Sequence, residues 1–345
     1  MKVLVINNMA PFVWGGAEEL AENLKQNLII HGHEAEILRI PFKYEPANDI
    51  ISQMMMVRAF ELTNVDHVIA LKFPVYLIRH PKKTIWLLHQ YRQAYDLFDV
   101  GLSNIPNSDN GLKLKKSIKN ADNEAFIESR AIYTNSKVTQ DRLFKYNNIK
   151  STVLLPPVNN PEIFTGGIMD DYIFAGGRIN GMKRQCLLLE ALSKTKKRVK
   201  MIIAGPPDSD ADRNTLILLL EKLNLKDRVK LDLRFLPRQE YANYLNKSLA
   251  SIYIPLDEDS LGYVMMESAT AGKALLTTSD SGGLLHLVKH KETGLISEPN
   301  AESIAEILDV IWEDKKKALL YGEQAREYWN SLNITWNNVI KVLVK

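Results

Sequence analysis

The stretch Asp171–Lys183, DYIFAGGRINGMK, indicates the fold class most clearly. Its first part, Asp171–Ala175, is mostly apolar and is typical of a buried strand. Two glycines follow, and the pattern beyond them predicts a helix near Lys183–Ser193. A short apolar strand joined by a glycine turn to a helix is the repeating unit of a parallel α/β sheet.

The same alternation of strands and helices runs along the whole chain. A helix is predicted over Ala17–Ile30. Further strands are predicted over Lys2–Asn7, Glu34–Ile40, Asp66–Leu71, Thr84–His89, Ala131–Thr134, Lys200–Ala204, Leu249–Ile254 and Ala274–Thr277. This rhythm predicts two α/β domains, each with a parallel sheet wrapped by helices.

A proline-rich linker marks the expected boundary between the domains. Pro156–Pro161 holds three prolines in six residues, which restricts the local direction of the chain. We therefore expect a first domain over 1–157 and a second over 158–327. The tail, Tyr328–Lys345, is predicted to form one last helix.

Composition excludes several classes of protein. The 345 residues are 46% hydrophobic and 25% charged, unlike a disordered chain, a collagen or a small disulfide scaffold. Lys and Arg number 44 and Asp and Glu 41, and this near balance argues against a nucleic-acid binder. The one cysteine, Cys186, excludes an intrachain disulfide. Because we find no export signal and no apolar span, we expect a cytoplasmic protein, at most peripheral at the inner membrane surface.

The segment 107–120, NSDNGLKLKKSIKN, carries four lysines and shows no strong period. We expect a loop here. It is either simply solvated or a mobile basic loop that faces an anionic acceptor or lipid headgroups.

Two glycine-containing turns are candidates for binding an anion. Gly15 and Gly16 stand at a strand-to-helix turn, where backbone N–H groups can face a phosphate or sugar. Arg178 follows the strand of the opening stretch, and Lys183 is expected in the first turn of its helix. A cation opposes the dipole at a helix start, so this placement suggests a bound diphosphate. Neither turn has the glycine spacing of a dinucleotide-binding fingerprint.

An acidic stretch, Asp257–Glu267, follows the strand that ends near Ile254. Asp259 is expected in a loop and Glu267 on the following helix, and eight helical residues rise ~12 Å. The two carboxylates could therefore reach opposite ends of a long ligand. Acidic capping of a core helix is an alternative, and so is a metal-binding pair formed by Asp257 and Asp259.

Taken together, these motifs resemble those of retaining family 4 glycosyltransferases of the GT-B architecture. The resemblance covers nearly all of the chain and is strongest from Tyr172 to Glu298. The family has Glu at the first acidic position, where this chain has the shorter Asp259. The resemblance rests on Gly15-Gly16, Asn135-Ser136, Gly177-Arg178 with Lys183, and the acidic segment through Gly262, Glu267 and Gly272.

The resemblance implies a fold and a set of site residues. The fold is two Rossmann-like domains facing across a cleft, with the C-terminal helix packing back on the first domain. Arg178 and Lys183 would bind the donor diphosphate, Asp259 the hexose hydroxyls and Glu267 the ribose. His89, matching a family histidine, would approach the donor sugar. The other donor-binding candidates are Gly15, Gly16, Leu236, Ser260, Leu261, Gly262 and Tyr263.

The function implied is transfer of a hexose, with retention, to a hydroxyl of a saccharide or lipid-linked acceptor in polysaccharide or glycoconjugate synthesis. UDP-glucose is the first expectation for the donor and GDP-mannose the second, with no metal and no other cofactor. Two alternatives remain open. One is a two-domain sugar-binding protein without catalysis, and the other is a sugar-nucleotide epimerase of the same architecture.

Overall fold

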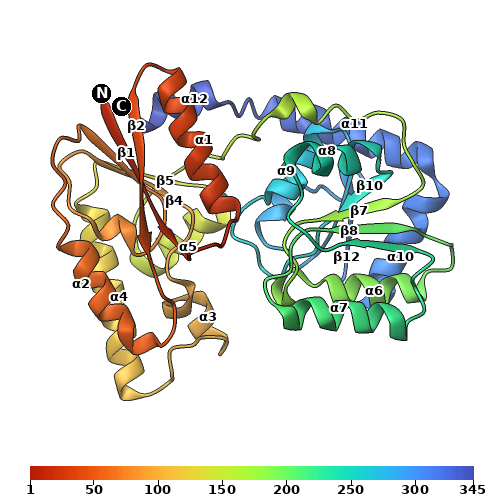
Figure 1. The fold of residues 1–345 in the computed structure, drawn as a ribbon, viewed down its shortest axis with the longest axis horizontal. Coiled ribbons are helices and arrows are strands. Elements are labelled where there is room, and N and C mark those ends of the chain that lie inside the picture. Colours follow the sequence, from red (N-terminus) through yellow and green to blue (C-terminus); the bar gives the residue numbers. More distant parts are fainter. The chain divides into compact units, whose positions relative to one another are not determined.

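The computed structural model describes residues 1–345, and the chain divides into two compact units (Figure 1). Unit 1 consists of Met1–Pro157 together with Ile334–Lys345, and unit 2 of Val158–Asn333. Each unit contains one six-stranded sheet in which every pairing is parallel. The predicted α/β class with two Rossmann-like domains is confirmed.

The sheet of unit 1 has the strand order β2-β1-β3-β4-β5-β6. The order reverses between β1 and β3, so connections on the two sides of this point leave toward opposite faces. The strands are β1 (Lys2–Met9), β2 (Glu34–Pro41), β3 (His67–Ala70), β4 (Lys83–Leu87), β5 (Ala131–Thr134) and β6 (Thr152–Val153).

Helices cover both faces of this sheet (Figure 1). Val3 and Val5 of β1 pack with α1 (Gly16–Ile30) and α12 (Trp336–Leu343), whereas Ile6 packs in the cluster on the other face. The remaining helices of unit 1 are α2 (Ile50–Arg58), α3 (Asp96–Asp99), α4 (Asp109–Ile127) and α5 (Lys137–Asn147).

The segment 107–120 is not the expected loop but the start of the helix α4. Ser108 caps it by accepting a hydrogen bond of 3.3 Å from the Gly111 amide. Leu114, Ile118 and Ala125 form a buried stripe at helical spacing. The buried Asp122 stands within that stripe, and this polar residue hides the period in the sequence.

The tail is not one helix as expected. The helix α11 ends at Ser331, Asn333 takes the left-handed conformation with φ of 47°, and α12 begins at Trp336. Thr335 caps α12 through a hydrogen bond of 3.2 Å from the Asn338 amide. Val339, Ile340 and Leu343 of α12 are buried in the cluster with α1. The predicted packing of a C-terminal helix on the first domain is thus confirmed.

The sheet of unit 2 has the strand order β12-β11-β10-β7-β8-β9, in which β7 and β10 are neighbours although they are not consecutive. Phe174 of β7 packs its ring against Tyr241 of α8, on the opposite face from α6. The strands are β7 (Ile173–Gly176), β8 (Met201–Ala204), β9 (Val229–Asp232), β10 (Ala250–Ile252), β11 (Ala274–Thr278) and β12 (Gly294–Ser297).

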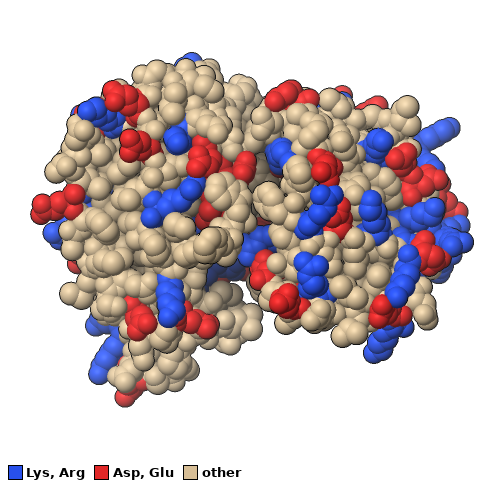
Figure 2. Space-filling view, in the orientation of Figure 1, with Lys and Arg blue, Asp and Glu red and all other residues tan.

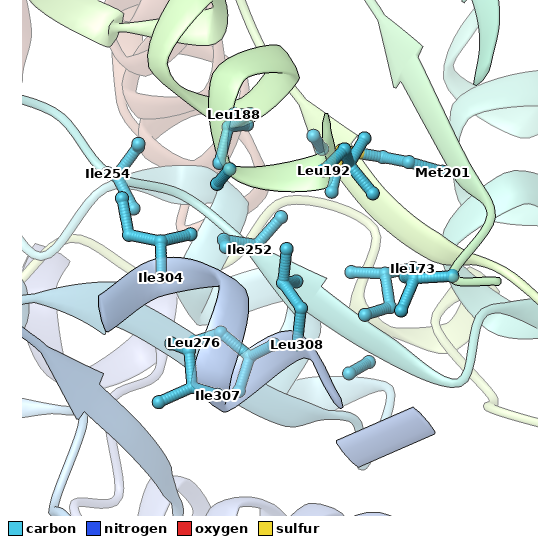
Figure 3. Packing of buried hydrophobic residues seen from close by; sticks show 14 of the residues in the cluster. Ile173, Leu188, Leu192, Met201, Ile252, Ile254, Leu276, Ile304, Ile307 and Leu308 are labelled. Carbon is cyan, nitrogen blue, oxygen red and sulfur yellow. The ribbon is translucent and has the colours of Figure 1, made fainter. Parts of the chain in front are cut away.

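One hydrophobic cluster joins the strands of unit 2 to helices that cover one face of the sheet (Figure 3). Ile173 and Ile252 of the sheet, Leu188 and Leu192 of α6, and Leu308 of α10 all lie in it. The helices of unit 2 are α6 (Gln185–Lys194), α7 (Asp210–Lys222), α8 (Arg238–Lys247), α9 (Tyr263–Thr270), α10 (Ala301–Glu313) and α11 (Lys315–Ser331).

Candidate functional site

The candidate site lies at the carboxyl ends of β7 and β10. These strands are neighbours at the point where the strand order of unit 2 reverses. In open α/β sheets ligands bind at such a reversal, outside the carboxyl ends of the strands. The chain leaves β7 through Gly177–Lys183, which holds Arg178 and Lys183, and leaves β10 through Tyr253–Gly262, which holds Asp259.

The turn after β7 is braced by the turn after β8. A Cβ on Gly205 would lie 2.1 Å from the Gly177 oxygen, so only glycine allows the two turns to approach this closely. The Arg178 guanidinium donates two hydrogen bonds to Asp208, of 2.7 and 2.6 Å. Burial alone would raise the pKa of Asp208, but hydrogen bonds from Arg178 and Asn180 hold it below its ordinary value.

Lys183 does not lie in the first turn of α6 as expected. It ends the 3-10 turn Gly181–Lys183, and α6 begins at Gln185. Between them Arg184 adopts φ of 57°, and its guanidinium hydrogen-bonds Asp280 and the carbonyl of Ile254. That network interrupts the helical pattern before α6.

The ammonium group of Lys183 forms an ion pair with Glu258. It also lies 5.3 Å from the centre of the Tyr253 ring. Burial, with Glu258 nearby, raises the pKa of Tyr253 well above its ordinary value, so the hydroxyl stays protonated. The anion-binding candidate Lys183 is therefore held by protein groups on two sides.

The loop after β10 that contains Asp257, Glu258 and Asp259, here called the acidic loop, is held in place by the segment that follows β11. The Gly283 amide donates a hydrogen bond of 2.7 Å to the Glu258 oxygen, and a Cβ on Gly283 would lie 2.5 Å from the Ser260 oxygen. Asp259 lies in this loop with 8% of its surface exposed. The helix α9 begins after Gly262, so Asp259 precedes the helix and Glu267 is on it, as predicted.

Glu267 is almost fully buried, at 2% exposed. It accepts a hydrogen bond of 2.5 Å from Arg238, which also donates one of 2.8 Å to the Asn159 oxygen. Burial, with Glu267 nearby, raises the pKa of Tyr241 well above its ordinary value. Leu236 is buried in the short segment before α8.

The remaining predicted site residues belong to unit 1. Gly15 is the N-cap of α1, and its amide donates a hydrogen bond of 3.1 Å to Glu18 within the same first turn. Gly16 is exposed. His89 does not end β4 as expected, because that strand stops at Leu87. Its Nδ1 lies 2.8 Å from the Gln90 oxygen.

Arg178, Lys183 and the segment Ser260–Glu267 all belong to unit 2. Lys183 contacts Glu258 of the acidic stretch, and a Cβ on Gly177, next to Arg178, would lie 3.3 Å from Val264 of α9. Sequence reasoning missed the partners Asp208 and Arg238. Asp208 directly follows a Gly-Pro-Pro turn at the end of a predicted strand, a signal that could have identified it. Nothing in the sequence links Arg238 to Glu267, 29 residues further on.

No group of three or more His, Cys, Asp or Glu residues has the geometry to hold a metal ion. No helix combines the length and apolar character that crossing a membrane requires.

This fold and site define a class of protein: two parallel α/β units, with cations and buried acids where one sheet reverses its order. Within that class, residues 166–328 match the family described as glycosyl transferases group 1. The part of the chain that carries the candidate site thus matches this family, and the resemblance to GT-B glycosyltransferases of family 4 is confirmed.

Relatives of known structure share the fold over nearly the whole chain. Sucrose-phosphate synthase from Thermosynechococcus elongatus superposes with a TM-score of 0.79 at 16% identity, covering 99% of this chain and 97% of that one. HepE from Anabaena, in complex with UDP and glucose, gives 0.72 at 16% identity, covering 99% and 98%. WaaG, a glycosyltransferase involved in lipopolysaccharide biosynthesis, gives 0.73 at 14% identity, with 99% of both chains covered.

A curated relative from Haemophilus influenzae, described as an uncharacterized glycosyltransferase, is 25% identical over 187 residues. The match covers 53% of this chain and spans about half, 51%, of the length of that relative.

Proposed function

We propose that the protein is a retaining glycosyltransferase that moves a hexose from a nucleotide diphosphate sugar to a hydroxyl of a saccharide or lipid-linked acceptor. The observation that carries this proposal is the position of Arg178 and Lys183. Both follow the carboxyl end of β7, the neighbour of β10, inside the segment that matches the family, and Lys183 contacts Glu258 in the loop after β10. Synthesis of a polysaccharide or glycoconjugate is the use that fits such a transfer.

The cations would stabilise the leaving group. Breaking the bond between sugar and diphosphate leaves negative charge on the phosphate, and preorganised positive groups lower the barrier to that step. Arg178 offers a planar fork for phosphate oxygens and Lys183 a point charge. Backbone amides over Ser260–Tyr263, at the start of α9, would add further donors.

Polar groups around the cations would orient the rest of the donor. Asp259 would hold the hexose hydroxyls and Glu267 the ribose, while the backbone near Leu236 would contact the base. In unit 1, His89 would approach the sugar, and Gly15 and Gly16 would contact the donor. The buried position of both acids supports a holding role, since a carboxylate in a fixed place binds hydroxyls without reorganising.

Retention would follow from attack on the face that the diphosphate leaves, with the leaving phosphate taking the acceptor proton. The anomeric configuration of the product, read by proton NMR, tests this directly. A product with inverted configuration would exclude the same-face mechanism.

UDP-glucose is the first choice of donor and GDP-mannose the second. Support for UDP comes from HepE, a relative of the same fold, which was solved in complex with UDP-glucose. The test is to incubate the protein with each sugar nucleotide, with and without saccharide acceptors, and to measure the nucleoside diphosphate released.

Lys183→Ala should lower the transfer rate by roughly 100-fold or more, because a preorganised charge facing the leaving group is lost. The matched control is Lys194→Ala, at the last residue of α6, where Lys194 forms an exposed ion pair with Glu302. Near-normal rates in Lys183→Ala would remove the diphosphate assignment. Conversion of the donor without any acceptor would indicate an epimerase, and binding without turnover a sugar-binding protein.

We also propose transfer without a metal ion, since Arg178 and Lys183 can supply the positive charge that a divalent cation would bring to a diphosphate. Transfer should therefore be unchanged by EDTA and by added Mn²⁺. Loss of activity in EDTA that Mn²⁺ restores would contradict this and would favour the alternative of a metal at Asp257 and Asp259.

A peripheral membrane contact is proposed for the exposed face of α4. This face presents Lys113, Lys116 and Lys119 beside the half-exposed Leu112. Lys115 ion-pairs with Asp99 at 3.3 Å, which ties the turn carrying the exposed Val100 to this helix. Basic residues with interspersed apolar ones suit an anionic lipid surface.

The test of this contact is flotation with vesicles containing one-third phosphatidylglycerol. The double variant Lys113→Glu with Lys116→Glu should lose binding, whereas Lys222→Glu, on α7, should retain it. Equal binding by the two variants would exclude α4 as the contact.

A further inference from the structure

The proposed function leaves one carboxylate at the site without a role. Glu258 forms the ion pair with Lys183, and the two side chains are 22% and 21% exposed. Water screens a pair at this depth less than it screens a pair on the open surface. The Glu258 carboxylate therefore stands where an incoming phosphate would have to meet Lys183.

The backbone of Glu258 is fixed by hydrogen bonds. Its carboxylate, in contrast, has only one weak polar contact besides the ion pair with Lys183. The backbone pairs with Gly282 and accepts a hydrogen bond of 2.7 Å from the Gly283 amide. The carboxylate's other polar contact is with the Tyr253 hydroxyl at 3.4 Å, which is long for a hydrogen bond. The carboxylate can leave Lys183 by rotation of its own side chain, with the loop unchanged.

Asp208, the partner of Arg178, differs from Glu258 because several hydrogen bonds hold its carboxylate in place. Its carboxylate receives two hydrogen bonds from Arg178 and a third, of 2.7 Å, from Asn180. Its own amide donates one of 3.0 Å to the Ile179 oxygen. Asp208 therefore braces the turn after β7, and displacing it would disturb the turn itself.

We propose that Glu258 is a built-in competitor of the donor diphosphate: its carboxylate holds Lys183 until the diphosphate displaces it. This inference rests on the proposed function, because it requires Lys183 to bind the diphosphate. The exchange replaces one anionic partner of Lys183 by another, so the net gain on binding is smaller than for an unpaired lysine. Binding of the nucleoside diphosphate product is weakened by the same competition, so the product dissociates more readily.

The test is a calorimetric titration of the full-length protein with UDP and with GDP. Glu258→Gln keeps the size of the side chain and removes its charge. The dissociation constant for the nucleotide that binds should fall roughly three- to tenfold, the range for a partly exposed ion pair no longer displaced. Glu221→Gln is the matched control, because Glu221 forms an ion pair of 2.7 Å with Lys226 on the surface of the same unit. Its dissociation constant should equal that of the wild type.

The outcomes separate this inference from the proposed function. If the wild type binds UDP or GDP and Glu258→Gln binds no more tightly than Glu221→Gln, the competitor role falls and the transferase remains. If the wild type binds neither nucleotide, both fall. Should Glu258→Gln fail to fold by circular dichroism, Glu258→Asp takes its place. The shorter acid should then lower the dissociation constant by a smaller factor, and an unchanged constant would overturn the role.

Discussion

At the scale of single residues, two acids of this chain have pKa values shifted in opposite directions, Asp208 downward and Asp122 upward. Asp208 is held ionised by Arg178, as described above. Asp122 on α4 is fully buried and accepts a hydrogen bond of 2.7 Å from Tyr95. Burial raises the pKa of Asp122 to about 7, although the hydrogen bond from Tyr95 opposes the rise. Below about pH 7 the carboxyl group of Asp122 is therefore mainly protonated in the folded protein.

The raised pKa of Asp122 makes stability depend on pH in a defined direction. In the unfolded chain Asp ionises near pH 4, so between about pH 4 and 7 rising pH favours the unfolded state. Asp122→Asn, which cannot ionise, should gain about 2–3 kcal/mol over the wild type between pH 5 and 8. Urea unfolding at both pH values measures this gain. Histidines titrate equally in both proteins and cancel in the difference.

The control for this prediction is Asp109→Asn, which changes an exposed acid at the start of the same helix. Its stability relative to the wild type should stay constant between the two pH values. A constant difference for Asp122→Asn as well would mean that Asp122 is ionised in the folded protein.

At the scale of elements, the sequence predicted strands better than it predicted helix ends. The predicted strand Ala131–Thr134 coincides with β5, and Ala274–Thr277 differs from β11 by one residue, since strands of a parallel sheet are short, largely apolar runs. The start of α6 was misplaced because Arg184 is held out of the helix by Asp280, a contact with no local signal. The acidic stretch was recognised as a candidate site, but the ion pair between its Glu258 and Lys183 was not predicted, because the two residues are 75 positions apart in the sequence.

The helix α12 shows how an element distant in sequence completes a core. Leu343 is fully buried in the cluster formed with α1 and the sheet of unit 1. Leu343→Ala removes buried methyl groups and leaves a cavity, so it should destabilise unit 1 by about 2–5 kcal/mol. Calorimetric unfolding measures the change. The exposed Leu319→Ala on α11 is the control and should be nearly neutral.

At the scale of the whole molecule, each unit carries its own sheet and its own core, while charge is mixed over both. Figure 2 shows basic and acidic side chains interspersed on the visible face, with no continuous basic field. This agrees with the near balance of 44 basic and 41 acidic residues and a net charge of +3. Separate cores make it possible to ask which unit a ligand stabilises.

UDP should raise the unfolding temperature of unit 2 in particular, because Arg178, Lys183 and Glu267 all belong to it. At a concentration of 100 times the dissociation constant, a ligand specific for the folded state adds about 2.7 kcal/mol. For a unit of this size that corresponds to an increase of roughly 5–10 °C. Scanning calorimetry of Leu343→Ala separates the units, since that variant lowers the transition of unit 1 and leaves unit 2 in place as the reference. If UDP shifted only the transition that Leu343→Ala lowers, the nucleotide would bind unit 1 and the diphosphate site at β7 and β10 would be wrong.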